Sequence, residues 1–102
     1  MTPQDDAPTT RKPALWRELV GEQLRGRRES RDESLRSVAK RAGVSPQYLS
    51  EVERGIKEPS SEILAAIGAS LDASLLDLTA GVARRLHGDA VAARRGEYRL
   101  AA

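Results

Sequence analysis

Apolar residues recur at intervals of three and four along most of this chain, a spacing that predicts amphipathic α-helices and no strands. The first helix is expected to start at Pro13, because proline suits the first turn of a helix, and to end near Ser30. The residues expected on its inner face are Leu15, Leu19, Val20 and Leu24.

Helix-end residues divide the rest of the pattern into four more helices. Ser34, Ser45 and Ser60 are suitable N-caps, and Ser74 with Asp77 has the spacing of a capping box. Glycine at positions 43 and 55 suits the left-handed conformation found just past a helix. The apolar residues expected on the inner faces are Leu35, Val38, Ala39, Ala42, Val44, Leu49, Val52, Ile63, Leu64, Ile67 and Leu71, and Leu75, Leu76 and Leu78 are expected to begin the fifth helix.

These elements predict an all-α domain of five helices between two loose ends. Residues 1–12 place prolines among polar residues without an apolar period, which is typical of a disordered arm. The folded domain is expected over residues 13–87. Residues 88–102 are rich in alanine and arginine and lack a clear stop signal, so we expect them to form a flexible tail.

Composition limits the chemistry open to the chain. With 102 residues there is room for one domain, and the absence of cysteine excludes disulfides, cysteine-based zinc sites and thiol catalysis. One histidine, His87, and scattered glycines provide neither a metal site nor a phosphate loop, so we expect no enzyme, no cofactor and no metal. No apolar run reaches membrane-spanning length, and a cytoplasmic protein without membrane contact is expected.

The functional signal lies in residues 35–54. Two short helices flank a turn at Gly43, Ala39 is small where the helices must approach, and Leu49 and Val52 can hold the second helix against the first. This pattern is typical of a helix-turn-helix, whose second helix enters the major groove of DNA. An ordinary solvated surface explains any one exposed residue, but it does not explain the whole pattern.

Burial of Leu49 and Val52 turns the other positions of that second helix outward. Gln47 can bond adenine, Glu51 can accept from cytosine, and Arg54 can bind guanine or phosphate. A net charge of +2 permits an anionic partner without requiring one. The residues predicted to contact DNA are Ser34, Arg36, Ser45, Pro46, Gln47, Tyr48, Ser50, Glu51, Arg54 and Lys57.

The run LRSVAKRAGVS at residues 35–45, with LS at 49–50 and EVERG at 51–55, resembles the Cro/C1-type (XRE) family of phage-repressor-like regulators. The resemblance implies a λ-repressor-like five-helix domain that binds double-stranded DNA, commonly as a homodimer on inverted repeats. It also implies an ion pair between Arg28 and Glu53. Asp32 and Glu33 stand where the family usually has glycine and an apolar residue, which predicts a looser or more exposed turn before the second helix.

A narrower resemblance covers residues 45–58 and 60–64. This stretch is similar to the actinobacterial Clp-gene regulators ClgR and PopR, which implies an activator of Clp protease genes. Members of that group end in two alanines that expose them to Clp proteolysis, and this chain ends in Leu100, Ala101 and Ala102. These three residues are the predicted degradation signal, with Clp protease as a partner. An arbitrary end in an alanine-rich chain is the alternative.

Other interpretations stay open on the sequence alone. A repressor or an antitoxin shares the same fold, although an antitoxin has only residues 88–102 left to bind a toxin. A protein-interaction module without DNA affinity leaves the exposed Gln47 and Arg54 without a purpose. The fifth helix, with Leu76, Val82 and Leu86, is the predicted homodimer surface, unless these residues only close the core of the monomer.

Overall fold

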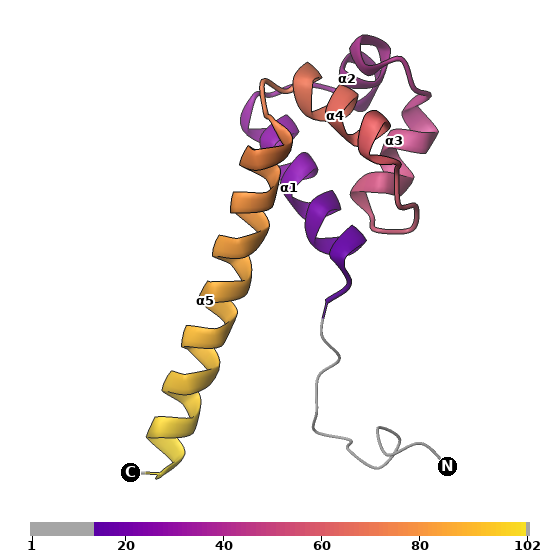
Figure 1. Cartoon of the computed structure of the whole chain (residues 1–102). Coiled ribbons are helices and arrows are strands. Elements are labelled where there is room, and N and C mark those ends of the chain that lie inside the picture. Colours follow the sequence, from indigo (N-terminus) through magenta and orange to yellow (C-terminus); the bar gives the residue numbers. More distant parts are fainter. Residues whose placement is uncertain (1–13, 102) are drawn as a thin grey trace, which may run out of the picture.

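The computed structural model describes the backbone of residues 14–101 and the side chains of residues 14–96. It contains α1 Trp16–Ser30, α2 Leu35–Ala42, α3 Pro46–Glu53, α4 Ser61–Ser70 and α5 Leu75–Ala101 (Figure 1). No strand occurs in this part of the chain. The predicted all-α fold of five helices is therefore confirmed. The predicted arm, residues 1–12, lies outside the described residues, as does Pro13.

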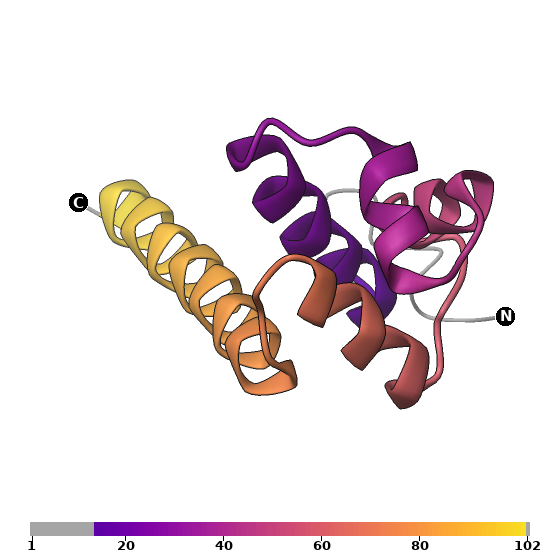
Figure 2. The same cartoon turned by 90° about the horizontal axis from the view of Figure 1, so that it is seen from above.

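Helix α1 is the central element of the bundle. Seen from above, α1 lies between α5 on one side and α2 and α3 on the other (Figure 2). It packs against both α3 and α5, while α2 packs against α3 and α4. Only the first turns of α5 belong to this bundle, and the rest of α5 extends away from it as a straight rod (Figure 1).

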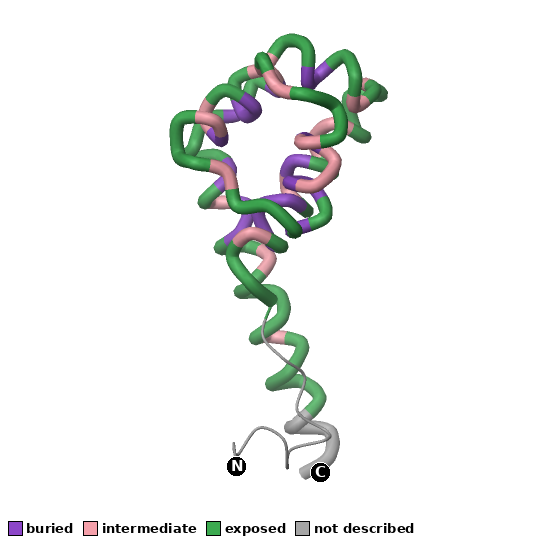
Figure 3. The backbone as a smooth tube through the Cα atoms, turned by 90° about the vertical axis from the view of Figure 1, so that its right-hand side faces the viewer, coloured by how far each residue is buried: buried purple, intermediate pink, exposed green. Residues whose placement is uncertain are grey.

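One aliphatic core joins the five helices. Figure 3 shows the buried residues gathered in the bundle, whereas the outer part of α5 is exposed. The core contains no aromatic residue, as the composition predicts, and Tyr48 packs against it only partly buried. The buried apolar residues are Leu19, Val20, Leu24, Val38, Ala39, Leu49, Val52, Leu64, Ile67, Leu71, Ala73, Leu78 and Val82.

The predicted caps are present and set where the short helices begin. The hydroxyl oxygens of Ser34, Ser45 and Ser60 accept the backbone N–H three residues later, at 3.1, 3.0 and 3.2 Å. Ser74 and Asp77 bond each other's backbone N–H, at 3.0 and 2.9 Å. These caps satisfy N–H groups that a helix start leaves without partners. The residues at which these helices begin are therefore defined by local sequence.

The turn between α1 and α2 is exposed at Asp32, as one of the two alternatives predicted, but it is not loose. Asp32 adopts the left-handed conformation, with φ 59°, that glycine usually supplies at such a turn. Aspartate tolerates this region better than most residues, because its short polar side chain can bond locally. Glu33 is held by Arg31 and Arg41, at 2.8 and 2.6 Å. Ion pairing therefore orients a turn that has aspartate where the family usually has glycine.

The predicted flexible tail over residues 88–102 also needs correction, because α5 continues to Ala101. Alanine, arginine and leucine have high helix propensity, and no proline interrupts them. Gly88 and Gly96 each cost about 1 kcal/mol relative to alanine, which does not stop the helix. The backbone of Leu100 and Ala101 is helical, and Ala102 lies outside the described residues.

The close approach of α1 to α3 gives a direct test of the fold. Gly21→Ala would place a Cβ 2.5 Å from the Glu53 carbonyl oxygen, so we expect a loss of about 1–3 kcal/mol in the free energy of unfolding. Gly26→Ala on the same helix is the matched control, because nothing lies within 4 Å of its Cβ. Its stability should rise by up to about 1 kcal/mol. Urea denaturation measures both, and equal stabilities would contradict this packing.

Candidate nucleic-acid interface

Helices α2 and α3 form the predicted helix-turn-helix. Gly43 has φ 75° and ends α2, and the Val44 N–H donates to the Ala39 carbonyl oxygen at 3.0 Å. Ala39 has no exposed surface and allows the two helices to approach. Leu49 and Val52 are buried in the core from α3. The turn and both helices are thus joined by backbone bonds and by packing.

The outer face of α3 is polar and accessible. Pro46, Gln47 and Arg54 are exposed, whereas Ser50 and Glu51 are half-buried. Gln47 and Arg54 form no side-chain hydrogen bond with residues 14–96. Their donors and acceptors are therefore available to an external partner.

The other residues predicted at DNA surround this face. Arg36 and Lys57 are exposed, and Tyr48 is half-buried against the core. The Ser34 and Ser45 oxygens already accept from the first turns of α2 and α3, so these serines act as caps. Each hydroxyl keeps one O–H that can still donate to an anion. The DNA contacts themselves stay predictions.

The predicted ion pair between Arg28 and Glu53 is present. Arg28 donates from Nε and Nη2 to the two Glu53 oxygens at 2.8 and 3.0 Å, and from Nη1 to the Glu33 carbonyl oxygen at 2.9 Å. The exposed fractions of the side chains are 13% for Arg28 and 5% for Glu53. The bond to Glu53 raises the pKa of Arg28 despite the opposing effect of burial. The pair therefore fixes the C-terminal end of α3 to α1.

A second arginine on α1 also binds the end of α3, and sequence reasoning missed it. Arg17 Nε donates to the Gly55 carbonyl oxygen at 2.8 Å. Gly55, with φ 74°, lies against Glu18, where a side chain would collide. Arg17, Gly21 and Arg28, here called the α1 clamp, follow a spacing of four and seven residues that places them on one face of α1. This spacing was the available signal.

A charged network ties α2 to the turns beside it. Arg41 and Arg31 both bind Glu33, and they lower the pKa of Glu33 to about 2. Arg31 also reaches Asp72 at 2.8 Å, and Arg41 donates to the Ser70 carbonyl oxygen at 2.6 Å. These side chains are solvent-accessible, so the network orients the α1–α2 and α4–α5 turns more than it stabilises them.

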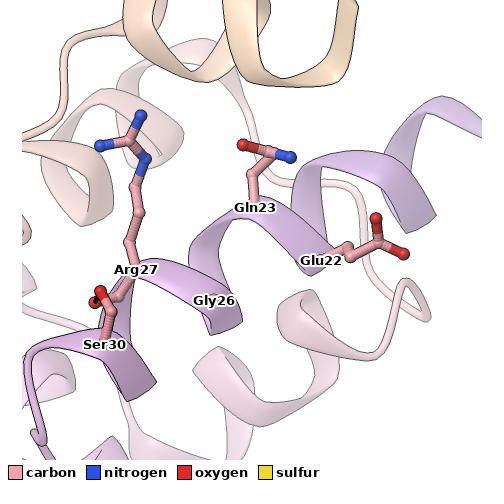
Figure 4. Close-up of a pocket in the computed structure, with 5 residues that line it drawn as sticks. All are labelled: Glu22, Gln23, Gly26, Arg27 and Ser30. Atoms are coloured by element: carbon pink, nitrogen blue, oxygen red, sulfur yellow. Dashed lines mark hydrogen bonds between the residues drawn. The ribbon is translucent and has the colours of Figure 1, made fainter. Parts of the chain in front are cut away.

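A shallow hollow on α1 lies away from the outer face of α3. It has a volume of about 210 Å³ and is lined by Glu22, Gln23, Gly26, Arg27 and Ser30. Gln23 and Arg27 extend from α1 toward α5 (Figure 4), and a Cβ at Gly81 of α5 would meet the Gln23 amide. The hollow therefore belongs to the packing of α1 against α5.

The predicted dimer surface on α5 is only partly available. Val82 is 2% exposed and belongs to the core, so its assignment to an interface was wrong. The reason is that the first turns of α5 still face α1, and Val82 lies on that side. Leu76 and Leu86 are 76% and 49% exposed and remain accessible.

The described residues were compared with the requirements of a metal site and of a membrane-spanning helix. No group of three or more histidine, aspartate, glutamate or cysteine residues is placed to hold a metal ion. No single helix is long and apolar enough to cross a membrane, and α4 with part of α5 reaches that length only across a 91° bend.

Comparison with known proteins places this arrangement in context. A family model described as helix-turn-helix matches residues 24–78. The transcriptional regulator ClgR of Mycobacterium tuberculosis is 56% identical over 62 residues, 61% of this chain and 55% of that protein. The match to an HTH-type transcriptional regulator SinR of Bacillus subtilis is 34% over 58 residues, 56% of this chain and 52% of that protein. The matched region thus spans about half the length of these relatives.

A solved structure is similar over most of the chain. The crystal structure of the clp gene regulator ClgR from Corynebacterium glutamicum has a TM-score of 0.74 and 39% sequence identity, and the match covers 87% of this chain and 93% of that one. A second structure of ClgR from C. glutamicum has a TM-score of 0.70 and 43% identity over 72% of this chain and 95% of that one. The similarity therefore includes part of α5 as well as the bundle.

The α1 clamp predicts that a glutamate-to-glutamine substitution lowers the free energy of unfolding by different amounts at two positions. Glu53→Gln removes a carboxylate that is 5% exposed and leaves the Arg28 charge uncompensated, so we expect a loss of about 3 kcal/mol in the free energy of unfolding. Glu29→Gln breaks the exposed pair with Arg25, where the side chains are 54% and 60% exposed, and should cost below about 1 kcal/mol. Denaturation at neutral pH measures both, and similar costs would show that the buried pair has no special weight.

Proposed function

Because the chain belongs to the helix-turn-helix family, we propose that it binds double-stranded DNA through the outer face of α3 and regulates transcription in the cytoplasm. The observation that carries this proposal is that α3 is fixed on its inner side and exposed on its outer face. Its inner residues and its C-terminal end are held by the core and by the α1 clamp, while Gln47 and Arg54 are left exposed. A helix whose inner face is fixed by the rest of the domain keeps its orientation when its outer face contacts base edges.

The chemistry of this face supports a division of roles. Gln47 lies near the start of α3, where the recognition helix of such motifs contacts base edges, and its amide suits adenine. Arg54 lies at the opposite end, as the C-cap of α3, and suits a backbone phosphate. Gln47 therefore contributes to sequence discrimination, and Arg54 contributes affinity for any sequence.

Substitution of Gln47 tests DNA recognition. Gln47→Ala should reduce discrimination at one base pair by about 1–3 kcal/mol, because one base-edge contact is lost. Arg54→Ala should instead weaken binding to all duplexes alike and flatten the salt dependence. Gel-shift titrations with a duplex selected from a random library, and with its single-base variants, measure both effects. An equal loss on every sequence for Gln47→Ala would contradict the assignment of Gln47.

We also propose that the active form is a homodimer that uses α5 and binds an inverted repeat. Leu76 and Leu86 are large apolar side chains exposed on a helix that extends beyond the bundle. Pairing two such helices would remove the Leu76 and Leu86 side chains from water. The two copies of α3 in the dimer would then contact two half-sites.

Sedimentation tests the dimer. The native chain should sediment as a dimer at micromolar concentration, and the double variant Leu76→Gln with Leu86→Gln should sediment as a monomer with an unchanged fold. Ile56→Gln is the control, because Ile56 is likewise a large exposed apolar residue, at 56%, but lies in the loop after α3. A native chain that stays monomeric even with its selected duplex would exclude the dimer.

The likeness to proteins named clp gene regulator supports a narrower proposal. We infer that this chain activates genes for the Clp protease and is itself degraded by that protease through Leu100, Ala101 and Ala102. α5, which is described to Ala101, extends away from the bundle (Figure 1), so a protease can engage the end of this helix before the core opens. Such an arrangement is a negative loop, because free protease removes its own activator.

Charge at the C-terminus tests this proposal. Replacing Ala101 and Ala102 by aspartate should lengthen the cellular half-life and leave DNA affinity unchanged, because an apolar grip is lost outside the bundle. Ala14→Asp, at an exposed position before α1, controls for added charge. Pulse-chase measurement in the native host decides the question, and equal half-lives would show that these residues are not a degradation signal.

A further inference from the structure

A cleft beside α3 contains arginines from two parts of the chain. It has a volume of about 220 Å³ and lies where α1, the start of α2 and α3 meet. The buried Arg28 and Glu53 pair forms its inner wall, and the exposed Arg25 and Arg54 stand at its rim. The lining residues are Arg25, Arg28, Leu35, Ser50, Glu53 and Arg54.

The charges in this cleft do not cancel. Three arginines and one glutamate line it, which leaves two positive charges in excess. Arg28 and Glu53 neutralise each other, so the excess belongs to Arg25 and Arg54 at the rim, where Arg25 is paired only with Glu29 outside the cleft. Arg54 has no hydrogen bond or ion pair to the side chains of residues 14–96. The cleft therefore favours an anion over a cation or a neutral ligand.

Arg25 is not committed to its present partner. Its Nε bonds Glu29 at 3.1 Å, but the two side chains are 60% and 54% exposed, so solvent screens this pair. The Nη atoms of Arg25 have no partner within the described side chains. An incoming dianion or phosphodiester could therefore recruit Arg25 at little cost.

The position of the cleft identifies the anion. Ser50 and Arg54 are four residues apart and share one side of the outer face of α3. A helix lying in the major groove has the phosphodiester backbone along its flanks. Leu35 begins α2, whose N-terminal end carries the positive end of the helix dipole. Arg25, Ser50 and Arg54 therefore line one cleft, on the side of α3 where a backbone phosphate would lie.

We propose that Arg25 and Arg54 bind one DNA backbone phosphate in this cleft, with the Ser50 hydroxyl as a third donor. The inference rests on the proposed DNA binding and adds to it a contact from α1, outside the helix-turn-helix. Because a phosphate contact fixes register without reading sequence, Arg25 sets how α3 enters the groove. Binding of the phosphate also exchanges the Arg25 bond to Glu29 for a bond to DNA.

Arg25→Gln tests the site with a duplex selected from a random library by the native protein. We expect roughly tenfold weaker binding at about 0.1 M salt, and a salt slope reduced by about 1 per bound protomer. The loss should be similar on random duplexes. Glu29→Gln should strengthen binding, since it releases Arg25. Arg95→Gln, exposed on the outer part of α5, is the control and should leave binding unchanged.

Methylphosphonate substitution locates the contact. The phosphates of the selected duplex are neutralised one at a time. At one position per half-site, neutralisation should weaken binding of the native protein as much as Arg25→Gln weakens binding to the unmodified duplex. Combining that duplex with Arg25→Gln should cause no further loss, and Arg54→Gln should behave likewise.

The possible failures are distinguishable. Unchanged affinity and salt slope for Arg25→Gln, or additive losses at every neutralised phosphate, would overturn the phosphate site, while Gln47→Ala would still report on DNA recognition. Failure of the native protein to select any duplex would overturn the proposed function together with this inference.

Discussion

The bond between Arg28 and Glu53 is the interaction on which the orientation of α3 depends. α3 has eight residues, too few to be stably helical alone in water, so its shape and direction come from packing. Gly21 lets α1 approach the Val52 and Glu53 carbonyl groups, and the bidentate ion pair completes the junction. A buried pair contributes little net stability once desolvation is counted, but its geometry admits one arrangement of the two helices.

The same junction explains how a chain of net charge +2 presents a basic surface. Four arginines bind carbonyl or carboxylate oxygens of the protein itself, Arg17 and Arg28 at the junction and Arg31 and Arg41 at the surface. Arg36, Lys40, Arg54 and Lys57 are exposed on α2, α3 and the loop after α3. Internal pairing consumes acidic groups such as Glu33 and Glu53 and leaves these cations for an external anion. The distribution of charge is therefore more informative than its sum.

The features that could be predicted from sequence are those determined by residues close together in the chain. Serine caps, the positive φ of Gly43 and the burial of Leu49 and Val52 follow from spacing alone. The Arg28–Glu53 pair came from resemblance, because its partners lie 25 positions apart. Arg17 was missed because its spacing from Gly21 and Arg28 indicates a shared face of α1 but does not identify the Gly55 carbonyl as its partner. The Asp32 turn was misjudged because Asp32 itself adopts the left-handed conformation that glycine usually supplies, while Arg31 and Arg41 hold the neighbouring Glu33.

The length of α5 shows where apolar periodicity stops being a guide. Periodicity reports a face turned toward a core, and beyond Val82 the helix leaves the core. Apart from the ion pairs of Arg85 with Glu22 and Asp89, helix propensity sustains the remaining turns. At 1.5 Å per residue, 27 residues span about 40 Å, of which the outer half buries little. A single helix without packing is marginally stable in water. A second copy along Leu86 would supply the missing burial, so the proposed dimer and the helical order of the outer half of α5 are thermodynamically linked. A protease that must pull the C-terminal end into an extended form would act on the monomer in preference to the dimer.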